Sequence, residues 1–515
     1  MPKETLTQKQ TRMLRQPEVG IEEDIEAVYS KGEVEIGWPG GVRRIFEGLA
    51  RKYTAAIVGL ELGDEGKGRM VDNKISTLLG KDRVDSVNVV RFQGGSNAGH
   101  TVEKDGTRIA LHQIPSGIFH DRVVGIMDQG MVIHPEDLRT EILQVEETVG
   151  DTNGRLMLSQ NAILCTDLER AEEVLNRIRQ GRAKGGTGRG IGPSYAHHYD
   201  KLGFHIYDLM QENWRNQLGD QYERYEREFA ANDLRLADVE VPDLEATKRQ
   251  GKSISRTVGT KEEYLDRLEV VRTWLIQKDI VRNTFSIHSD TIGDFSKGVL
   301  FEGAQALGLH AWVGTRPDVT SSDTSILGIS AGTGLWKSQD VADRVGVFKI
   351  TYTSSVGVRR MPSQQENQWS NWVREVANEY GTTTGRPRDI LHLDLPMLSY
   401  NARMSGIEVM AGTHLDVARE DYTIKVCTHY TRDGVKVDYQ PGIKNLEDVS
   451  PSYVDLPGWD GKRVAEATAI DQLPENAIKF LSWIQRRTGY PIVAVTTGPA
   501  RENFIALPGN DYVGE

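Results

Sequence analysis

The sequence is poor in cysteine and has neither a long apolar run nor an excess of positive charge. Cys165 and Cys427 are its only cysteines and lie far apart, which argues against a disulfide framework or a cysteine-based zinc site and favours a reducing compartment. No apolar stretch approaches the roughly 20 residues of a membrane span. Residues 1–20 have no apolar signal core either. We therefore expect a cytoplasmic protein without membrane contacts.

The charge balance limits the class of ligand. A formal net charge of −12 gives no electrostatic footprint for nucleic acid, so we expect no nucleic-acid partner. A polyanionic substrate must then be met by a local cluster of positive groups, and small molecules fit better. The 38% hydrophobic and 26% charged content is typical of a globular chain that buries a large core.

Short apolar runs alternate with helical stretches from Tyr53 onward. This alternation predicts an α/β fold with a central, mostly parallel sheet flanked by helices. Glycine clusters follow several of the runs, which places the active site at the carboxyl edge of the sheet. The runs are TAAIVGL, VDSVNVVRF, RLMLS, GVLFEG, VGVFKIT, IEVMAG and PIVAVTTGP.

We expect one catalytic domain at residues 53–515, preceded by a polar N-terminal extension at residues 1–52. The strand signal disappears over residues 208–292, which predicts a helical subdomain within the catalytic domain. A stripe of large side chains at helical spacing predicts packing there. Its members are Trp214, Leu218, Tyr222, Tyr225 and Phe229.

The segment AIVGLELGDEGKGR at residues 56–69 contains the first of two glycine-dense loops. Glycines without Cβ atoms let backbone N–H groups turn toward a polyanion, and here they are Gly63, Gly66 and Gly68. Lys67 adds a point charge, while Asp64 and Glu65 add carboxylates, which suits phosphate and metal together. Because the residue after Lys67 is glycine rather than Ser or Thr, the segment is not a Walker A loop.

Three further motifs carry groups suited to phosphate or carboxylate chemistry. The second glycine loop, RFQGGSNAGHT, places His100 where an imidazolium can stabilise a departing phosphoryl oxygen. Residues 185–193, GGTGRGIGP, resemble a mobile lid with hydroxyl and guanidinium donors. Arg386 and Arg388 in GTTTGRPR offer the two guanidiniums that a dicarboxylate clamp requires.

Residues 54–510 contain, in this order, the motifs GDEGKG, RFQGGSNAGHT, IPSGI, GTGRGIGP, FEGAQ, VTSS, TTTGRPR and TTGP. This ordered set of motifs resembles the adenylosuccinate synthetase family. The resemblance implies a ligase that joins L-aspartate to C6 of inosine monophosphate (IMP) through a 6-phosphoryl intermediate, giving adenylosuccinate. It also implies GTP as the phosphate donor, Mg²⁺ as the metal ion and a homodimer.

The resemblance assigns the catalytic steps to a few residues. Asp64 would take the N1 proton so that the purine O6 can attack the γ-phosphate, and would also touch the metal together with the Gly99 carbonyl. His100 would stabilise charge on the β-phosphate, and Lys67 would neutralise the phosphates. Gln305 would hold the purine at its O6 edge.

The resemblance also implies a larger set of binding residues. For the phosphate donor and metal these are Gly63, Glu65, Gly66, Gly68, Gly99, Thr101, His414, Asp416, Thr496 and Gly498. For IMP and aspartate they are Asn97, Thr187, Lys201, Thr320, Val356, Thr384, Arg386 and Arg388. Within this second set Val356 would contact the ribose, and the two arginines would hold the aspartate carboxylates.

Three positions depart from the family pattern. The guanine-reading Lys-x-Asp element appears as His414-Leu415-Asp416, which leaves ATP open as the donor. Lys201 stands where the family presents a partner-subunit arginine. Arg359 and Arg360 occur in a loop whose family pattern is rich in glycine and proline, and they either contact substrate or cover a surface.

Two other functions stay open at this point. The phage-type branch of the family makes 2-aminoadenylosuccinate from a guanine nucleotide with ATP or GTP. The second alternative is a regulatory protein that binds nucleotides without catalysis. The joint presence of Asp64, Lys67, His100 and Gln305 argues against the regulator, because a binder needs no base and no leaving-group stabiliser.

Overall fold

The structure is a computed structural model that describes residues 51–81, 84–104, 107–181, 186–355, 359–381 and 387–508. Residues 1–50, which form nearly all of the predicted N-terminal extension, lie outside the described residues. The first described strand begins at Arg51, two residues before the predicted start of the catalytic domain at 53. Within the described ranges no helix combines the length and the apolar character needed to cross a membrane.

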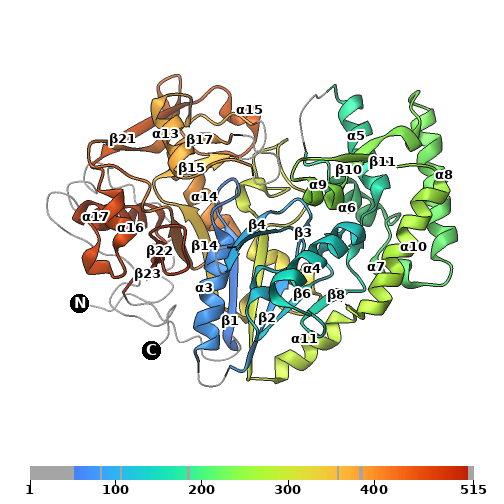
Figure 1. The fold of residues 1–515 in the computed structure, drawn as a ribbon. Helices are drawn as coiled ribbons and strands as arrows, with labels where there is room; N and C mark the ends of the chain where they lie inside the picture. Colours follow the sequence, from blue (N-terminus) through green and yellow to red (C-terminus); the bar gives the residue numbers. More distant parts are fainter. Residues whose placement is uncertain are drawn as a thin grey trace.

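A large, twisted, mostly parallel sheet forms the centre of the protein (Figure 1), which confirms the predicted fold class. Neighbouring strands pair in parallel, except that β22 and β23 pair antiparallel at one edge. The spatial order is β12 (Val281–Arg282), β8 (Leu156–Ser159), β6 (Val123–Met127), β2 (Ser86–Arg91), β13 (Lys297–Ala306), β1 (Arg51–Gly59), β14 (Val341–Lys349), β18 (Val409–Thr413), β22 (Ile492–Thr496) and β23 (Phe504–Ala506).

Consecutive apolar residues make these strands suitable for the middle of a sheet. Ala55, Ala56, Ile57 and Val58 of β1 are all 0% exposed, so both faces of the strand are covered. Figure 1 shows α8 and α10 at one end of the molecule and α16 and α17 at the other. The helices are α3 (Lys67–Leu79), α4 (Pro135–Val149), α5 (Asp167–Arg179), α6 (Ile191–Asp200), α7 (Ile206–Met210), α8 (Trp214–Ala230), α9 (Leu244–Gln250), α10 (Lys261–Lys278), α11 (Thr284–Gly293), α12 (Ile329–Thr333), α13 (Gln368–Val376), α14 (Leu395–Ser405), α15 (Ile443–Leu446), α16 (Gly461–Glu466) and α17 (Glu475–Thr488).

Smaller sheets surround the central one. The largest is mixed and contains β15 (Tyr352–Ser355), β16 (Gln364–Gln365), β17 (Asp389–Asp394), β19 (Ile424–Arg432), β20 (Val435–Val437) and β21 (Ser450–Leu456). Three short strands that follow strands of the central sheet pair with one another: β3 (Gly94–Gly95), β7 (Met131–Ile133) and β9 (Ile163–Leu164). Two ribbons complete the set: β4 (His100–Lys104) with β5 (Thr107–Leu111), and β10 (Glu240–Pro242) with β11 (Ser255–Thr257).

The segment 208–292 is mainly helical, but it is not free of strands as the sequence indicated. It contains the ribbon β10–β11, and β12 joins the edge of the central sheet. The predicted stripe lies on α8, and all of its members are buried. They pack in one cluster with residues of β6, β8, α4 and α5. The segment therefore shares its core with the rest of the protein.

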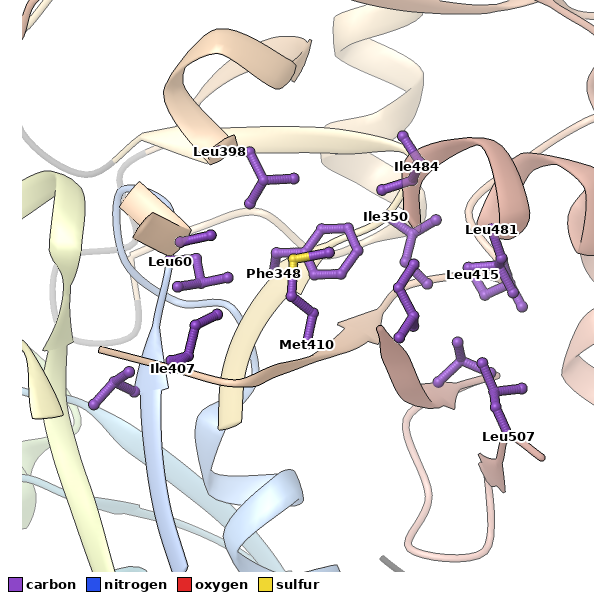
Figure 2. Packing of buried hydrophobic residues seen from close by; sticks show 14 of the residues in the cluster. Leu60, Phe348, Ile350, Leu398, Ile407, Met410, Leu415, Leu481, Ile484 and Leu507 are labelled. Carbon is purple, nitrogen blue, oxygen red and sulfur yellow. The ribbon is translucent and has the colours of Figure 1, made fainter. Parts of the chain in front are cut away.

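A second cluster supports the sheet edge near β18. In Figure 2 the side chains of Leu60, Phe348 and Met410 lie close together, with Leu398 above them. Leu415, Leu481 and Ile484 continue the same cluster toward α17. Leu60 directly follows β1, and Leu415 lies two residues after the end of β18, so this packing fixes the two loops in which polar motif residues occur.

Candidate active site

The motif residues gather where parallel strands end. The two glycine loops follow β1 and β2, and His414-Leu415-Asp416 follows β18. FEGAQ forms the carboxyl-terminal part of β13, and TTGP begins at the last residue of β22. These strands include neighbours in the central sheet, so their carboxyl ends share one edge.

The first glycine loop has the backbone of an anion site. Gly63, Asp64 and Gly66 have φ angles of 104°, 57° and 81°, and Gly66 caps the N-terminus of α3. A left-handed backbone at a residue other than glycine costs about 1–3 kcal/mol and is typical of functional sites. The start of a helix leaves N–H groups without intrahelical partners, which favours an anion at this loop.

Glu65 lies underneath this loop rather than in it. Its carboxylate accepts hydrogen bonds from the N–H groups of Glu61 (3.2 Å) and Gly63 (2.8 Å), and Lys67 Nζ lies 2.9 Å away. The side chain is 0% exposed. We therefore correct the prediction that its carboxylate faces phosphate or metal: Glu65 shapes the loop and holds the Lys67 ammonium.

His100 belongs to a buried network of hydrogen bonds that was not predicted from the sequence. Its Nδ1 pairs with Glu302, and Nε2 lies 3.2 Å from the Ala304 carbonyl oxygen. Ser116 donates its backbone N–H to Glu302 at 2.8 Å. Burial would raise the pKa of Glu302, but the charge and hydrogen bond of His100 lower it to about 2. Glu302 thus orients the imidazole of His100. The sequence feature that could have predicted this role is a carboxylate within the otherwise apolar run GVLFEG.

Asn97, Gln305 and Thr320 come together from three segments. Gln305 Nε2 donates to Asn97 Oδ1 at 3.0 Å, and Asn97 Nδ2 donates to Thr320 Oγ1 at 3.4 Å. Ser322 Oγ lies 3.3 Å from Gln305 Oε1. The amides and hydroxyls form a polar cluster next to the second glycine loop.

Arg388 lies between two carboxylates at the first glycine loop. Its guanidinium contacts Asp64 at 2.5 Å and Glu379 at 2.7 Å. Burial opposes its charge, but the two carboxylates outweigh that effect and raise the pKa of Arg388. Lys349 also pairs with Glu379. Burial would raise the pKa of Glu379, but these two cations hold it well below its usual range. Glu379 and Lys349 were not predicted.

The segment after β18 forms the other end of the candidate site. Burial and the charge of Lys349 lower the pKa of His414 to about 3, so its imidazole is neutral at physiological pH. Burial raises the pKa of Asp416 despite the charge of Arg69. Arg69 donates to the carbonyl oxygens of Gly498 and Pro499. A partly buried carboxylate therefore stands next to the TTGP loop.

Thr496 supports this segment from below. Its hydroxyl accepts the N–H of His414 and its carbonyl accepts the N–H of Leu415, both at 3.2 Å. The residue is 1% exposed. The Thr496 hydroxyl therefore fixes the position of the neighbouring loop.

Other predicted residues lie outside this cluster or outside the described residues. Thr187 is exposed, and Lys201 is an exposed residue with φ 66° at the C-terminus of α6. Gly99 is half-buried before β4, in which Thr101 pairs with Ala110. Three predicted site residues lie outside the described residues: Val356, Thr384 and Arg386.

The two additional arginines differ in their surroundings. Arg359 is 4% exposed and donates to the Asp318 carbonyl oxygen, and burial lowers its pKa to about 10. Arg360 is exposed. Arg359 is thus part of the interior and does not cover a surface.

Among the described residues, one group of side chains has the spacing of a metal site, and it is not the predicted one. His134, Glu136 and Asp167 offer atoms within 4.8 Å of one another. Arg256 lies 2.6 Å from Glu136 and 2.9 Å from Asp167, and Arg267 lies 3.1 Å from Asp167. Because arginines already neutralise these carboxylates, the group is an ion-pair network.

Comparisons with known proteins point to one family. A family model described as adenylosuccinate synthetase matches residues 56–505. The adenylosuccinate synthetase of Lactobacillus acidophilus is 34% identical over 454 residues, covering 88% of this chain and 98% of the relative. That of Aquifex aeolicus is 35% identical over 455 residues, covering 88% and 96%.

Comparison with solved structures points to the same family. The fully ligated adenylosuccinate synthetase of Plasmodium falciparum superposes with a TM-score of 0.76 at 29% identity, covering 88% of this chain and all of that chain. The succinoaminodeoxyadenylate synthetase of cyanophage S-2L, bound to dGMP and dATP, gives a TM-score of 0.51 at 19% identity, covering 89% and 96%. This second likeness concerns the fold alone. The chain belongs to the adenylosuccinate synthetase family and is a ligase that forms a C–N bond.

Proposed function

We propose that the protein joins L-aspartate to C6 of IMP with GTP as the phosphate donor, giving adenylosuccinate, GDP and phosphate. The observation that carries this proposal is the contact of Asp64 with Arg388 at 2.5 Å. It puts the carboxylate expected to act on the purine next to a guanidinium expected to hold the aspartate substrate. A reaction that joins these two molecules requires such a neighbourhood.

In the first step, Asp64 accepts the N1 proton of IMP. The electron pair of the N1–H bond then increases the charge on O6, which attacks the γ-phosphorus of GTP. The bond between the γ-phosphorus and the bridging oxygen breaks, and GDP leaves. His100, held by Glu302, donates toward the β-phosphate as its charge increases. Lys67 is held by Glu65 at the N-terminus of α3, where it offsets phosphate charge.

In the second step, the amine of aspartate attacks C6 of 6-phosphoryl-IMP. The C6–O6 bond breaks, phosphate leaves with O6, and the amine loses its proton. Gln305 holds the purine, and Asn97 holds the phosphate of the nucleotide. Arg388, which contacts Asp64 and Glu379 in this structure, would release one of these carboxylates and bind a carboxylate of the aspartate substrate instead. Arg386 and Thr384 would complete this aspartate site, as the sequence predicts.

Oxygen donors in the first two loops suit Mg²⁺. The Asp64 side chain is 30% exposed, and a Cβ placed on Gly99 would meet nothing within 4 Å, so both residues are accessible. Hard cations of this kind prefer carboxylate and carbonyl oxygens together with substrate phosphates. Bound there, Mg²⁺ would neutralise phosphate charge.

The proposal is tested by incubating the purified protein with aspartate and each combination of IMP or GMP with GTP or ATP. We expect aspartate-dependent product, followed by absorbance and mass, with IMP and GTP. Product from GMP and ATP alone would favour the phage-type activity instead. No product from any pair would favour a regulatory protein. No observation here favours either alternative.

The base of the phosphate donor is proposed to be read by Asp416. Guanine offers N1–H and N2–H₂ donors to a carboxylate, and adenine offers neither. A carboxylate that adenine leaves unpaired costs at least about 1–3 kcal/mol, which corresponds to about ten- to a hundredfold preference for GTP. Asp416→Asn should therefore lower kcat/KM for GTP and narrow the difference between GTP and ATP. The measurement is kcat/KM for GTP and ATP in both proteins, with Asp421→Asn as an exposed control. Equal use of ATP and GTP by the wild type would contradict base reading by Asp416.

We further propose a homodimer in the cytoplasm. The dimer is supported by family membership, and Lys201 would face the partner's nucleotide. The compartment is supported by Cys165 and Cys427, which are free and buried. Sedimentation at several concentrations would show a monomer if the dimer is wrong.

A further inference from the structure

The segment between α5 and α6 has the backbone of a second anion-binding concavity. Gly186, Gly188 and Gly190 have φ angles of 73°, 69° and 74°, and they alternate with Thr187 and Arg189. Successive N–H groups converge in such an alternation and form a nest that binds an anion.

A carboxylate of the protein itself occupies this nest. Glu173 of α5 accepts the N–H of Gly188 on Oε1 and the N–H of Gly190 on Oε2, both at 2.8 Å. A Cβ added to Gly186 would lie 2.1 Å from Glu173 Oε1, so the carboxylate touches the backbone at a third point. Both carboxylate oxygens are used, and these two N–H groups are not free for a substrate phosphate.

The side chain of Arg189 anchors the same segment from another direction. Its guanidinium lies 3.2 Å from Asp137, a buried carboxylate that also pairs with Arg170. Thr187 stands between the anchored positions and is exposed. Among the described residues, no hydrogen bond holds its hydroxyl.

The segment leads directly to the candidate site. α6 starts at Ile191, and Tyr195 OH accepts the N–H of Gly94 in the second glycine loop at 3.1 Å. A Cβ on Gly192 would lie 3.7 Å from Ser321 Oγ in the VTSS motif. The main chain on either side of Thr187 is therefore fixed relative to Asn97 and Thr320.

We propose that Glu173 is a positioning residue for the IMP site. Its carboxylate fixes the main chain of residues 186–190 so that the Thr187 hydroxyl is directed at the nucleotide phosphate. A carboxylate suits this task because its charge-assisted bonds to N–H groups are roughly twice as strong as neutral ones. The inference rests on the proposed function only for the identity of the ligand.

The effect on the backbone is tested without substrate. Glu173→Gln should increase hydrogen exchange at the amides of Gly188 and Gly190 about tenfold, the worth of one charge-assisted bond. Glu228→Gln is the matched control. Glu228 of α8 pairs on the surface, at 2.9 Å, with Arg179 of α5, the helix that also carries Glu173. Unchanged exchange in Glu173→Gln would overturn the proposal, whatever reaction the enzyme catalyses.

Kinetics test the role in substrate binding. Glu173→Gln should raise KM for IMP about tenfold, while kcat and KM for aspartate stay within about twofold of the wild type, as in Glu228→Gln. Glu173→Asp, which keeps the charge, should fall between Glu173→Gln and wild type. An unchanged KM for IMP would overturn the proposal. A lower KM would also overturn it, because the carboxylate would then be a competitor of the phosphate. If Glu173→Gln lowers kcat and the melting temperature and weakens both substrates alike, Glu173 has only a structural role and the proposal is overturned.

Discussion

Replacement of Asp64 with alanine is expected to lower kcat by about 10²–10⁴-fold, the usual contribution of a general base. Without this carboxylate the purine keeps its N1 proton and O6 is a poor nucleophile. Binding of IMP and GTP should change only a few-fold, because Arg388 keeps its second partner, Glu379, at 2.7 Å. Single-turnover rates and equilibrium binding of each nucleotide separate the two effects.

Asp121→Ala is the matched control, since Asp121 is an exposed carboxylate at the surface. It should leave turnover unchanged. Near-normal turnover of Asp64→Ala would remove Asp64 from the mechanism, and a large loss of nucleotide binding would assign it to binding.

The second large effect is expected at His100. His100→Asn should lower kcat by about 10²–10³-fold, as the loss of a donor aimed at developing charge does in other enzymes. Asparagine retains an N–H donor for Glu302, so that buried carboxylate keeps a partner and folding is preserved. KM for GTP should move only a few-fold, because the contact strengthens as the β-phosphate gains charge.

His429→Asn, at a half-buried position outside the site, serves as the control for this substitution. A loss confined to KM for GTP would show that His100 binds the ground state. Glu302→Gln should give a smaller loss of kcat than His100→Asn, because it misorients the imidazole without removing it.

The fold was predictable because parallel strands buried on both faces read as continuous apolar runs. Residues 55–58 are such a run and lie in the middle of the sheet. The short strands β10, β11 and β12 were missed because a pairing of two or three residues leaves no periodic signal. The glycine loops were recognised because glycines, charged residues and apolar runs stand next to one another in the sequence.

The contacts among charged groups could not be predicted in the same way. Asp64 and Glu65 are adjacent in sequence, yet the first is exposed at the loop and the second is buried beneath it, a difference set by the turn at Gly63 and Gly66. Glu302 pairs with His100, which is 202 residues away in the sequence. Glu379 pairs with Arg388, which is only nine residues away, but residues at this spacing meet only if the chain turns back between them. Such pairings depend on the tertiary structure, which composition and spacing do not contain.

The central claim is that O6 of IMP becomes a leaving group by taking the γ-phosphate of GTP. The most direct measurement uses IMP labelled with ¹⁸O at O6, together with aspartate and GTP, and follows the label by mass spectrometry. We predict that the inorganic phosphate carries one ¹⁸O atom and that the adenylosuccinate carries none at C6. Unlabelled phosphate formed along with the aspartate adduct would contradict this account.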